Sequence, residues 1–254
     1  MHNEISNITK GLHLSKNRTI LAIHLHHEDR VDEFFRKVKL LLEVESEIWV
    51  SSANKELLQK VASMNILRSK VMKIFEVDNK WHDWSGYLAF LREIEPSFRL
   101  IVCNDSIVTR RVISKNTIRR FIKALEMDRP AIIGELDTAK CSIDIGGWSS
   151  ASWISTYLFA IKGLHFDVPQ LVDCVENDLE KVLTNSDHFF IRYLDDRRTD
   201  VVIDSDSKLS KLGAMFFERR LTRLAIENGL QIVDSCAGST VRKFERVLER
   251  FRDA

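Results

Sequence analysis

The sequence predicts an α/β fold with a mainly parallel sheet flanked by helices and a mixed C-terminal half. Two observations predict this class. Short apolar segments, typical of buried strands, alternate with segments of helical spacing over residues 18–113. Alternation of this kind favours parallel strands whose connecting helices cover both faces of the sheet. Beyond residue 113, strands and helices follow one another less regularly, which predicts the mixed half.

The first half begins with a strand and alternates from there. Short apolar segments predict strands at 19–26, 47–50, 70–77 and 100–103. A helix is expected at 55–64, between the second strand and the third. Two further helices are marked by apolar residues three or four positions apart: Val31, Phe34, Phe35, Val38, Leu41 and Leu42 in one, and Tyr87, Phe90, Leu91 and Ile94 in the other.

The second half predicts longer helices and fewer strands. The apolar, aromatic segment at 152–161 is interpreted as a strand, and Gly229 is expected to end a long helix at 209–228 as its C-cap. The remaining elements are a helix at 117–125, a strand at 131–134, a helix marked by Leu171, Val172, Val175, Leu179, Val182 and Leu183, a short strand at 230–233 and a final helix at 241–251.

Composition limits the classes of function. The chain has 254 residues, 44% hydrophobic and 30% charged, which is enough for one large domain or two small ones. A net charge of +1 gives no reason to expect a nucleic-acid partner. Residues 1–17 form a polar leader without the apolar core of a signal peptide, and no apolar run approaches the length of a membrane span. Four scattered cysteines without a CxxC pair favour a reduced, cytoplasmic compartment.

The most informative segment is the apolar run that leads into Asn104-Asp105-Ser106. An acidic residue just beyond the carboxyl end of a strand lies where open α/β sheets bind ligands. The Asp105 carboxylate can hold a divalent cation, which in turn can hold a diphosphate. The alternative is that Asp105 caps the helix that follows.

A second polar loop, residues 78–87, follows the third strand. Asp83 can accept hydrogen bonds from ribose hydroxyls or from a base N–H, or it can cap the helix that begins near Trp84. Asn79 can fix the loop through an Asx-turn. The two loops, at neighbouring strand ends, are expected to converge on one crevice.

His24 and His26 lie on one face of the first strand, because side chains alternate along a strand. With His27 they resemble metal ligands, but the third ligand of a closed site is not evident, although Glu28 and Asp29 are nearby. We favour a role at the floor or edge of a nucleotide crevice. Ser51, at the end of the second strand, is a further candidate for that crevice.

Glu218 lies on the long helix between aromatic and basic neighbours. A partly buried carboxylate with a raised pKa is suited to act as a general base. Pairing with Arg219, Arg220 or Arg223 on the helix surface is the alternative.

Six stretches, in order between residues 20 and 233, resemble the rhamnan-synthesis F type of polysaccharide biosynthesis proteins. They are Ile23–Asp29; Asn79 and Asp83 with Trp84-Ser85-Gly86; Asn104-Asp105-Ser106; the turn-like Gly134-Glu135-Leu136-Asp137; Ser155–Phe159; and Glu218 with Leu221-Thr222 and Asn228-Gly229. Three positions depart from the family. Trp81 and Ser85 stand where the family has glycine, and Ser152 stands where it has histidine.

The resemblance implies a GT-A-like glycosyltransferase that moves a sugar from a nucleotide-sugar donor to a growing bacterial surface polysaccharide, such as an O-antigen of lipopolysaccharide or a capsule, or to a lipid-linked glycan. It implies one domain at 18–254, with a nucleotide-binding half at 18–113 and an acceptor half at 114–254. Asn104-Asp105-Ser106 would replace an Asp-x-Asp motif, with Asp105 on a divalent cation (Mn²⁺ or Mg²⁺) or a donor phosphate and Asp83 on the nucleoside. The base would be Asp137 or Glu218. A cytoplasmic protein with peripheral contact at the inner membrane is expected.

Two other functions stay open. The departures at Trp81 and Ser152 favour a non-catalytic nucleotide-binding or assembly module of polysaccharide synthesis. Asp204 and Asp206 follow an apolar segment in the form strand–Asp-x-Asp, which Mg²⁺-dependent phosphohydrolases use. The late position of this pair and its polar surroundings favour a solvated turn.

Overall fold

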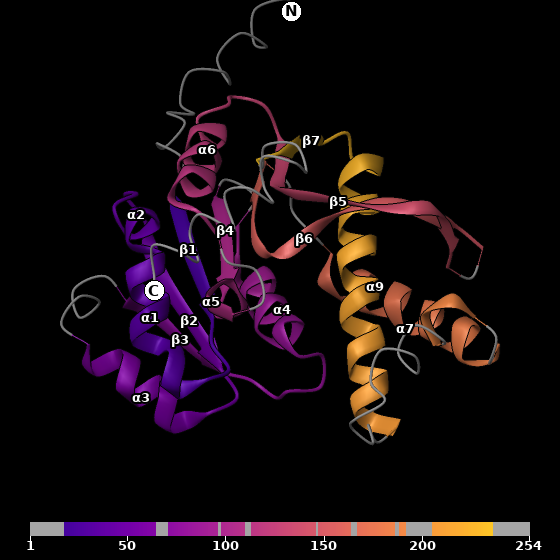
Figure 1. Cartoon of the computed structure of the whole chain (residues 1–254), viewed down its shortest axis with the longest axis horizontal. Coiled ribbons are helices and arrows are strands. Elements are labelled where there is room, and N and C mark those ends of the chain that lie inside the picture. Colours follow the sequence, from indigo (N-terminus) through magenta and orange to yellow (C-terminus); the bar gives the residue numbers. More distant parts are fainter. Residues whose placement is uncertain are drawn as a thin grey trace, which may run out of the picture.

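One seven-stranded sheet runs through the described part of the chain (Figure 1). The computed structural model describes residues 18–64, 71–95, 98–109, 113–145, 147–163, 167–185, 188–191 and 205–235. The strands are β1 (Thr19–His24), β2 (Glu47–Ser52), β3 (Val71–Glu76), β4 (Arg99–Asn104), β5 (Ala131–Asp144), β6 (Ser149–Lys162) and β7 (Gln231–Asp234). Their order is β3-β2-β1-β4-β6-β5-β7. Among these strands only β6 runs antiparallel to its neighbours, so the predicted fold class is confirmed.

Helices cover both faces of this sheet. They are α1 (Val31–Lys37), α2 (Lys39–Leu42), α3 (Lys55–Ser63), α4 (Asp83–Glu93), α5 (Ser106–Thr109), α6 (Lys115–Leu125), α7 (Val168–Leu183) and α9 (Ser205–Glu227), with a short 3₁₀ turn, η1, at Glu28–Arg30. Each face of the sheet has its own hydrophobic core, and alternate side chains of β1 point into one core or the other. Ile20 and Ala22 pack with α4, α7 and α9, whereas Leu21 and Ile23 pack with α1, α2, α3, α5 and α6. The central strands are therefore buried on both faces.

Capping residues that are recognisable in the sequence fix several helix ends. Asn54 accepts hydrogen bonds from the second and third residues of α3, and Ser114 accepts one from Thr117 at the start of α6. Gly229 lies two residues after the end of α9 and has a φ of 74°, as a C-cap glycine requires. The predicted long helix is thus confirmed at its C-terminal end.

The β5–β6 hairpin is the main difference from the sequence prediction. A strand at 131–134 followed by a turn at 134–137 was expected, but β5 continues to Asp144, so the turn is wrong. The pairing register shifts between Gly134 and Glu135, and a Cβ at residue 134 would lie 2.6 Å from Ile154 Cγ2. Because of this shift, β5 bends away from the main sheet and continues as a strand paired with β6. The hairpin that β5 and β6 form reaches across α9 (Figure 1).

Smaller differences also occur. The helix expected at 31–42 is divided at Val38, where ψ is 8°. The leader at 1–17, Asp204 and the final helix at 241–251 lie outside the described residues, and residue 206 lies in the first turn of α9. None of the helices described is both long and apolar enough to cross a bilayer.

Candidate functional site

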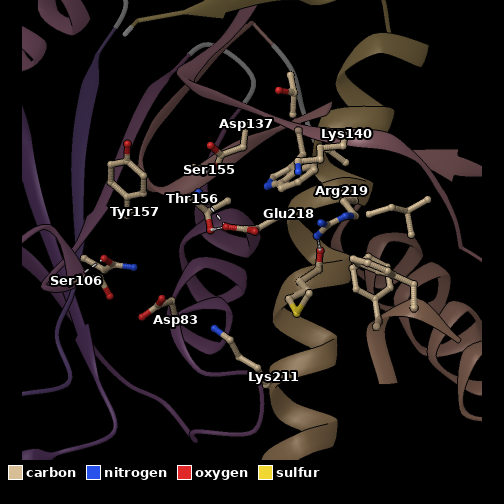
Figure 2. A pocket seen from close by; sticks show the side chains of 18 residues that line it. Asp83, Ser106, Asp137, Lys140, Ser155, Thr156, Tyr157, Lys211, Glu218 and Arg219 are labelled. Carbon is tan, nitrogen blue, oxygen red and sulfur yellow. Dashed lines mark hydrogen bonds between the residues drawn. The ribbon is translucent and has the colours of Figure 1, made fainter. Parts of the chain in front are cut away.

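A cavity of about 850 Å³ opens where the end of β4 faces the β5–β6 hairpin and α9 (Figure 2). This volume is typical of small-molecule sites. Five of the predicted site residues line it: Asp83, Asn104, Ser106, Asp137 and Glu218. The other lining residues are Thr138, Ala139, Lys140, Ile143, Trp153, Ser155, Thr156, Tyr157, Phe189, Phe190, Lys211, Met215 and Arg219.

Asn104 ties the end of β4 to two neighbouring elements. Its Nδ2 donates to Tyr87 Oη at 2.7 Å, and that hydroxyl donates to the Thr156 carbonyl at 2.7 Å. Asn104 Oδ1 accepts from the backbone N–H of Ser106 at 3.0 Å. Burial raises the pKa of Tyr87 well above its ordinary value, so the phenol keeps its proton and can donate. These hydrogen bonds fix the orientation of the Asn104 side chain at the cavity wall.

Asp105 holds the loop after β1. Its Oδ2 accepts from the backbone N–H of His26 at 2.9 Å and of His27 at 2.8 Å, and the residue is buried. The carboxylate neither caps α5 nor lines the cavity, since Asn104 supplies the hydrogen bond to Ser106. This geometry differs from the direct contact with cation or phosphate that the resemblance implies.

Asp83 begins α4 and faces both the cavity and His26. Its Oδ1 lies 2.6 Å from His26 Nε2. Although burial favours the neutral acid, this hydrogen bond and the charges of His26 and Lys211 hold the pKa of Asp83 below its ordinary value. The N-cap residue is His82, with φ 51° and no side-chain cap bond. A non-glycine residue in this conformation costs on the order of 1–3 kcal/mol, which the surrounding structure must offset to present Asp83.

His24 and Ser51 lie beneath α4, outside the cavity lining. His24 Nδ1 is 2.7 Å from Ser51 Oγ, and both residues are buried. Burial, followed by the charge of His26, lowers the pKa of His24 to about 3, so the imidazole is neutral. A Cβ on Gly86 would lie 2.2 Å from His24 Nδ1 and 2.4 Å from Ser51 Oγ. Only glycine lets α4 approach the histidine this closely.

Asn79 is exposed and does not line the cavity. The Asx-turn expected there is made by Asp78, whose Oδ1 accepts from the Lys80 N–H at 3.1 Å and from Ser85 Oγ at 2.8 Å. The loop is therefore held by an Asx-turn as predicted, but Asp78 makes the turn and not Asn79.

Glu218 faces the cavity from α9. Its Oε1 accepts from the Thr156 N–H at 3.1 Å and from the Thr156 hydroxyl at 2.8 Å. Burial raises the pKa of this carboxyl, and the hydrogen bonds from Thr156 oppose the shift only in part. Two of the arginines weighed as partners are engaged elsewhere: Arg220 Nη2 lies 2.6 Å from Asp178 Oδ1 and Arg223 Nε lies 2.6 Å from Glu227 Oε1.

Asp137 approaches the same space from β5. Its Oδ2 accepts a short hydrogen bond from Ser155 Oγ. Asp137 and Glu218 therefore line one cavity, each held by a hydroxyl residue of β6 (Figure 2).

Three cations that were not predicted as site residues also line the cavity: Lys140, Lys211 and Arg219. Arg219 is buried and stacks its guanidinium 3.9 Å above the Trp153 ring. Lys211, Met215 and Glu218 have the spacing i, i+4 and i+7, which places them on one face of α9. That spacing was the available signal, since it sets two charged residues on the face that meets the hairpin.

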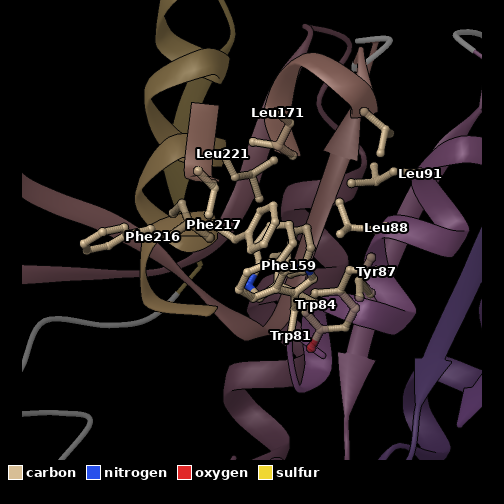
Figure 3. Close-up of a cluster of buried hydrophobic side chains, with 14 of the residues drawn as sticks. Trp81, Trp84, Tyr87, Leu88, Leu91, Phe159, Leu171, Phe216, Phe217 and Leu221 are labelled. Atoms are coloured by element: carbon tan, nitrogen blue, oxygen red, sulfur yellow. The ribbon is translucent and has the colours of Figure 1, made fainter. Parts of the chain in front are cut away.

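Two departures from the family pattern have structural roles. Trp81 is buried and packs on Phe217 with ring centroids 5.7 Å apart, near Trp84 and Tyr87 (Figure 3). Ser85 Oγ accepts from the Trp81 N–H at 3.1 Å. Trp81 and Ser85 are thus part of the core beside the cavity and do not line it. Ser152 pairs with Thr138 in the hairpin and also lies outside the lining.

Comparisons with known proteins give no family assignment. No family model and no curated protein matches the chain, so the resemblance to the rhamnan-synthesis F type remains an expectation.

Three solved structures are similar to the chain at low identity. The glycosyltransferase GlyE of Streptococcus pneumoniae TIGR4 has 7% identity and a TM-score of 0.36, with 85% of this chain and 45% of that chain covered. A 4-diphosphocytidyl-2C-methyl-D-erythritol synthase has 11% identity and a TM-score of 0.38. The 2-C-methyl-D-erythritol 4-phosphate cytidylyltransferase (IspD) of Francisella tularensis has 11% identity and a TM-score of 0.35. For each of the latter two, 92% of this chain and 99% of that chain are covered.

Proposed function

We propose that the protein is a glycosyltransferase that uses a nucleotide-sugar donor and acts on a bacterial surface polysaccharide or a lipid-linked glycan. One observation carries the proposal: polar groups suited to bind a nucleoside line the same cavity as a carboxylate and three cations. Polar residues at the carboxyl end of the parallel strands face a half-buried carboxylate, Glu218, and three cations from the hairpin and α9. The polar residues at the strand ends would bind the donor. The carboxylate and the cations would serve the displacement of its diphosphate.

In this proposal the nucleoside binds beside Asp83 and the end of β4. The lowered pKa of Asp83 keeps it an anion that accepts hydrogen bonds from ribose hydroxyls or from a base N–H. Asn104 and Ser106 form the neighbouring wall. In this proposal residues 18–113 contribute the nucleoside side of the site.

Lys140, Lys211 and Arg219 are assigned to the diphosphate. Charge develops on the leaving diphosphate as the sugar–phosphate bond breaks, and fixed cations stabilise that charge. Lysine binds phosphate as a point charge, whereas arginine offers a planar pair of donors. Lys211 is close enough to Asp83 and Glu218 to lower the pKa of both carboxyls, so it lies between the two sides of the proposed site.

Glu218 is the proposed base, in preference to Asp137. The base must take a proton from the acceptor hydroxyl, and a carboxylate with a raised pKa does this better at neutral pH. Oε1 of Glu218 is fixed by Thr156, and among the described residues Oε2 has no hydrogen bond. Asp137 is bound by Ser155 and is assigned to hold the hairpin.

The residues around Asp105 do not fit the Mn²⁺ or Mg²⁺ site implied by the resemblance. Oδ2 of Asp105 holds two backbone N–H groups, and both side-chain polar atoms of Asn104 are engaged. A hard cation needs several free oxygens. We therefore route no step through a cation there and assign Asp105 to positioning the loop after β1.

The acceptor is assigned to the hairpin side of the cavity. Trp153, Ile143, Phe189 and Phe190 give this wall an apolar, aromatic character. Aromatic side chains offer broad apolar surfaces on which the C–H face of a sugar ring can pack. In this proposal residues 114–254 contribute the acceptor side together with the cations assigned to the donor diphosphate.

A thermal-shift screen tests the proposal. Purified protein is heated with nucleoside diphosphates and nucleotide sugars, each well above micromolar concentration. Binding to the folded state raises Tm by mass action, so at least one nucleotide is expected to raise it by several degrees. A chain whose Tm no nucleotide changes would contradict the proposal. Binding without release of nucleoside diphosphate on adding acceptor would instead favour the non-catalytic nucleotide-binding module.

A further inference from the structure

We propose that His24, His26 and Asp83 form a binding site for a divalent transition-metal ion such as Zn²⁺. The site lies at the edge of the cavity and is distinct from the Asn104-Asp105-Ser106 segment. A ring nitrogen of each histidine and a carboxylate oxygen of Asp83 lie within 4.8 Å of one another.

The fold brings the three residues together from two elements. His24 ends β1 and His26 follows two positions later on the same side of the chain, with ring centroids 4.4 Å apart. Asp83 comes from the first turn of α4 and already contacts His26 Nε2. Asp105 fixes the His26 backbone, so the histidine pair is held before an ion binds.

The hydrogen bonding of His24 leaves one ring nitrogen available for an ion. Nδ1 is engaged by Ser51 Oγ at 2.7 Å. The other ring nitrogen, Nε2, is buried and has no hydrogen-bond partner within the part of the chain described. Metal-binding histidines commonly use one ring nitrogen for the ion and the other for a supporting hydrogen bond. An ion at Nε2 would satisfy a polar atom that is otherwise left unpaired.

The ligand set selects the class of ion. Two imidazoles and one carboxylate suit Zn²⁺ and its neighbours in the first transition series, whereas Mg²⁺ and Ca²⁺ prefer oxygen ligands. Ligand atoms around a tetrahedral zinc ion are about 3.3 Å apart, given bonds of about 2.0–2.1 Å. The three side chains must therefore draw together around the ion while the 2.6 Å contact between His26 and Asp83 opens. Three protein ligands leave a fourth position, next to the cavity that Asp83 also lines.

Metal titration of the full chain tests this site. Protein depleted of metal with a chelator is titrated with Co²⁺, followed by visible absorbance, and with Zn²⁺, followed by calorimetry. One equivalent is expected to bind. His26→Ala and Asp83→Asn are each expected to weaken binding at least about tenfold, and Ser51→Ala about tenfold through loss of the supporting hydrogen bond.

His27→Ala is the matched control, because His27 is the exposed neighbour whose contribution to Asp105 comes from the backbone. Its metal affinity is expected to equal that of the native chain. Circular dichroism of each variant checks the fold. Native protein that binds no stoichiometric metal would overturn the proposal, as would folded His26→Ala and Asp83→Asn variants with native affinity. The titration contains no nucleotide, so its outcome is independent of the proposed transferase activity.

Discussion

Thr156 donates two hydrogen bonds to Glu218, one from its backbone N–H at 3.1 Å and one from its hydroxyl at 2.8 Å. Both bonds reach the same oxygen, Oε1, so strand β6 fixes the carboxylate of a residue that lines the cavity (Figure 2). The pair joins α9 to the antiparallel strand of the sheet. A general base needs this kind of fixed orientation together with a raised pKa.

Glu218→Gln tests the proposed base. Glutamine keeps an oxygen for Thr156 but cannot take a proton, so transfer is expected to fall about 10²–10⁴-fold while nucleotide still raises Tm. The measurement is the rate of nucleoside diphosphate release in the presence of acceptor. Glu227→Gln, which removes an exposed partner of Arg223 on the same helix, is the control and should keep the native rate. An unchanged rate in Glu218→Gln would exclude Glu218 as the base.

The pH dependence of stability reports on the same carboxyl. Because the pKa of Glu218 is raised in the folded state, folding favours its protonated form, and this contribution to stability is lost as the pH rises through the folded pKa. Glutamine does not ionise, so Glu218→Gln is expected to gain stability relative to the native chain as the pH rises from 4 to about 8. Urea unfolding at several pH values measures this difference. A difference that shrinks with rising pH would show that the carboxylate is stabilised in the fold.

Asp105→Ala distinguishes a positioning role from direct ligand contact. Removal of the carboxylate leaves the N–H groups of His26 and His27 without their acceptor, and we expect a loss of about 2–4 kcal/mol in the free energy of unfolding. Asp105→Asn keeps one acceptor oxygen and is expected to lose less. Chemical denaturation measures both. Native stability combined with loss of nucleotide binding would instead assign Asp105 to the ligand.

Gly86→Ala tests the packing of α4 over His24. The new Cβ would lie 2.2 Å from His24 Nδ1, so the helix or the histidine must move, at a cost of about 1–3 kcal/mol. Ala89→Ser, a similar change in side-chain size on the same helix at a half-buried position, is the control. Equal stability of Gly86→Ala and the native chain would mean that the histidine is not held as closely as described.

Much of the fold could be predicted because the relevant signals are local. Apolar runs in β1, β2 and β4 and the spacing in α4 and α9 indicate buried strands and packed helices without knowledge of the partners. The length of β5 could not be predicted in this way. Beyond Gly134 the strand reads Glu-Leu-Asp-Thr-Ala-Lys, and its pairing depends on β6, about 20 residues away. A polar strand that is stabilised mainly by pairing with its neighbour has few of the local sequence features that predict a strand.

The site was predictable only in part. Asp83 and Asn104 line one cavity as expected, but the third and fourth strands are not neighbours, because β2 and β1 lie between them. Asp83, Asn104 and Glu218 stand out because they are polar residues at strand ends or among apolar neighbours. Asp83 lies beside His24 and His26 because α4 crosses over β1. The spacing of residues in the sequence does not indicate where two elements cross. Lys211 has the helical spacing of a site residue, but only the hairpin across α9 gives that face a cavity.

Calorimetric titration of a nucleoside diphosphate into the native chain and into Lys211→Met measures whether the cavity holds a diphosphate beside Lys211. Lys181→Met, an exposed lysine in the last turn of α7, is the control. The account predicts one-to-one binding to the native chain and to the control, with affinity at least about tenfold weaker in Lys211→Met, since one cation beside the diphosphate is lost. Equal affinity in all three proteins, or no binding to the native chain, would contradict it.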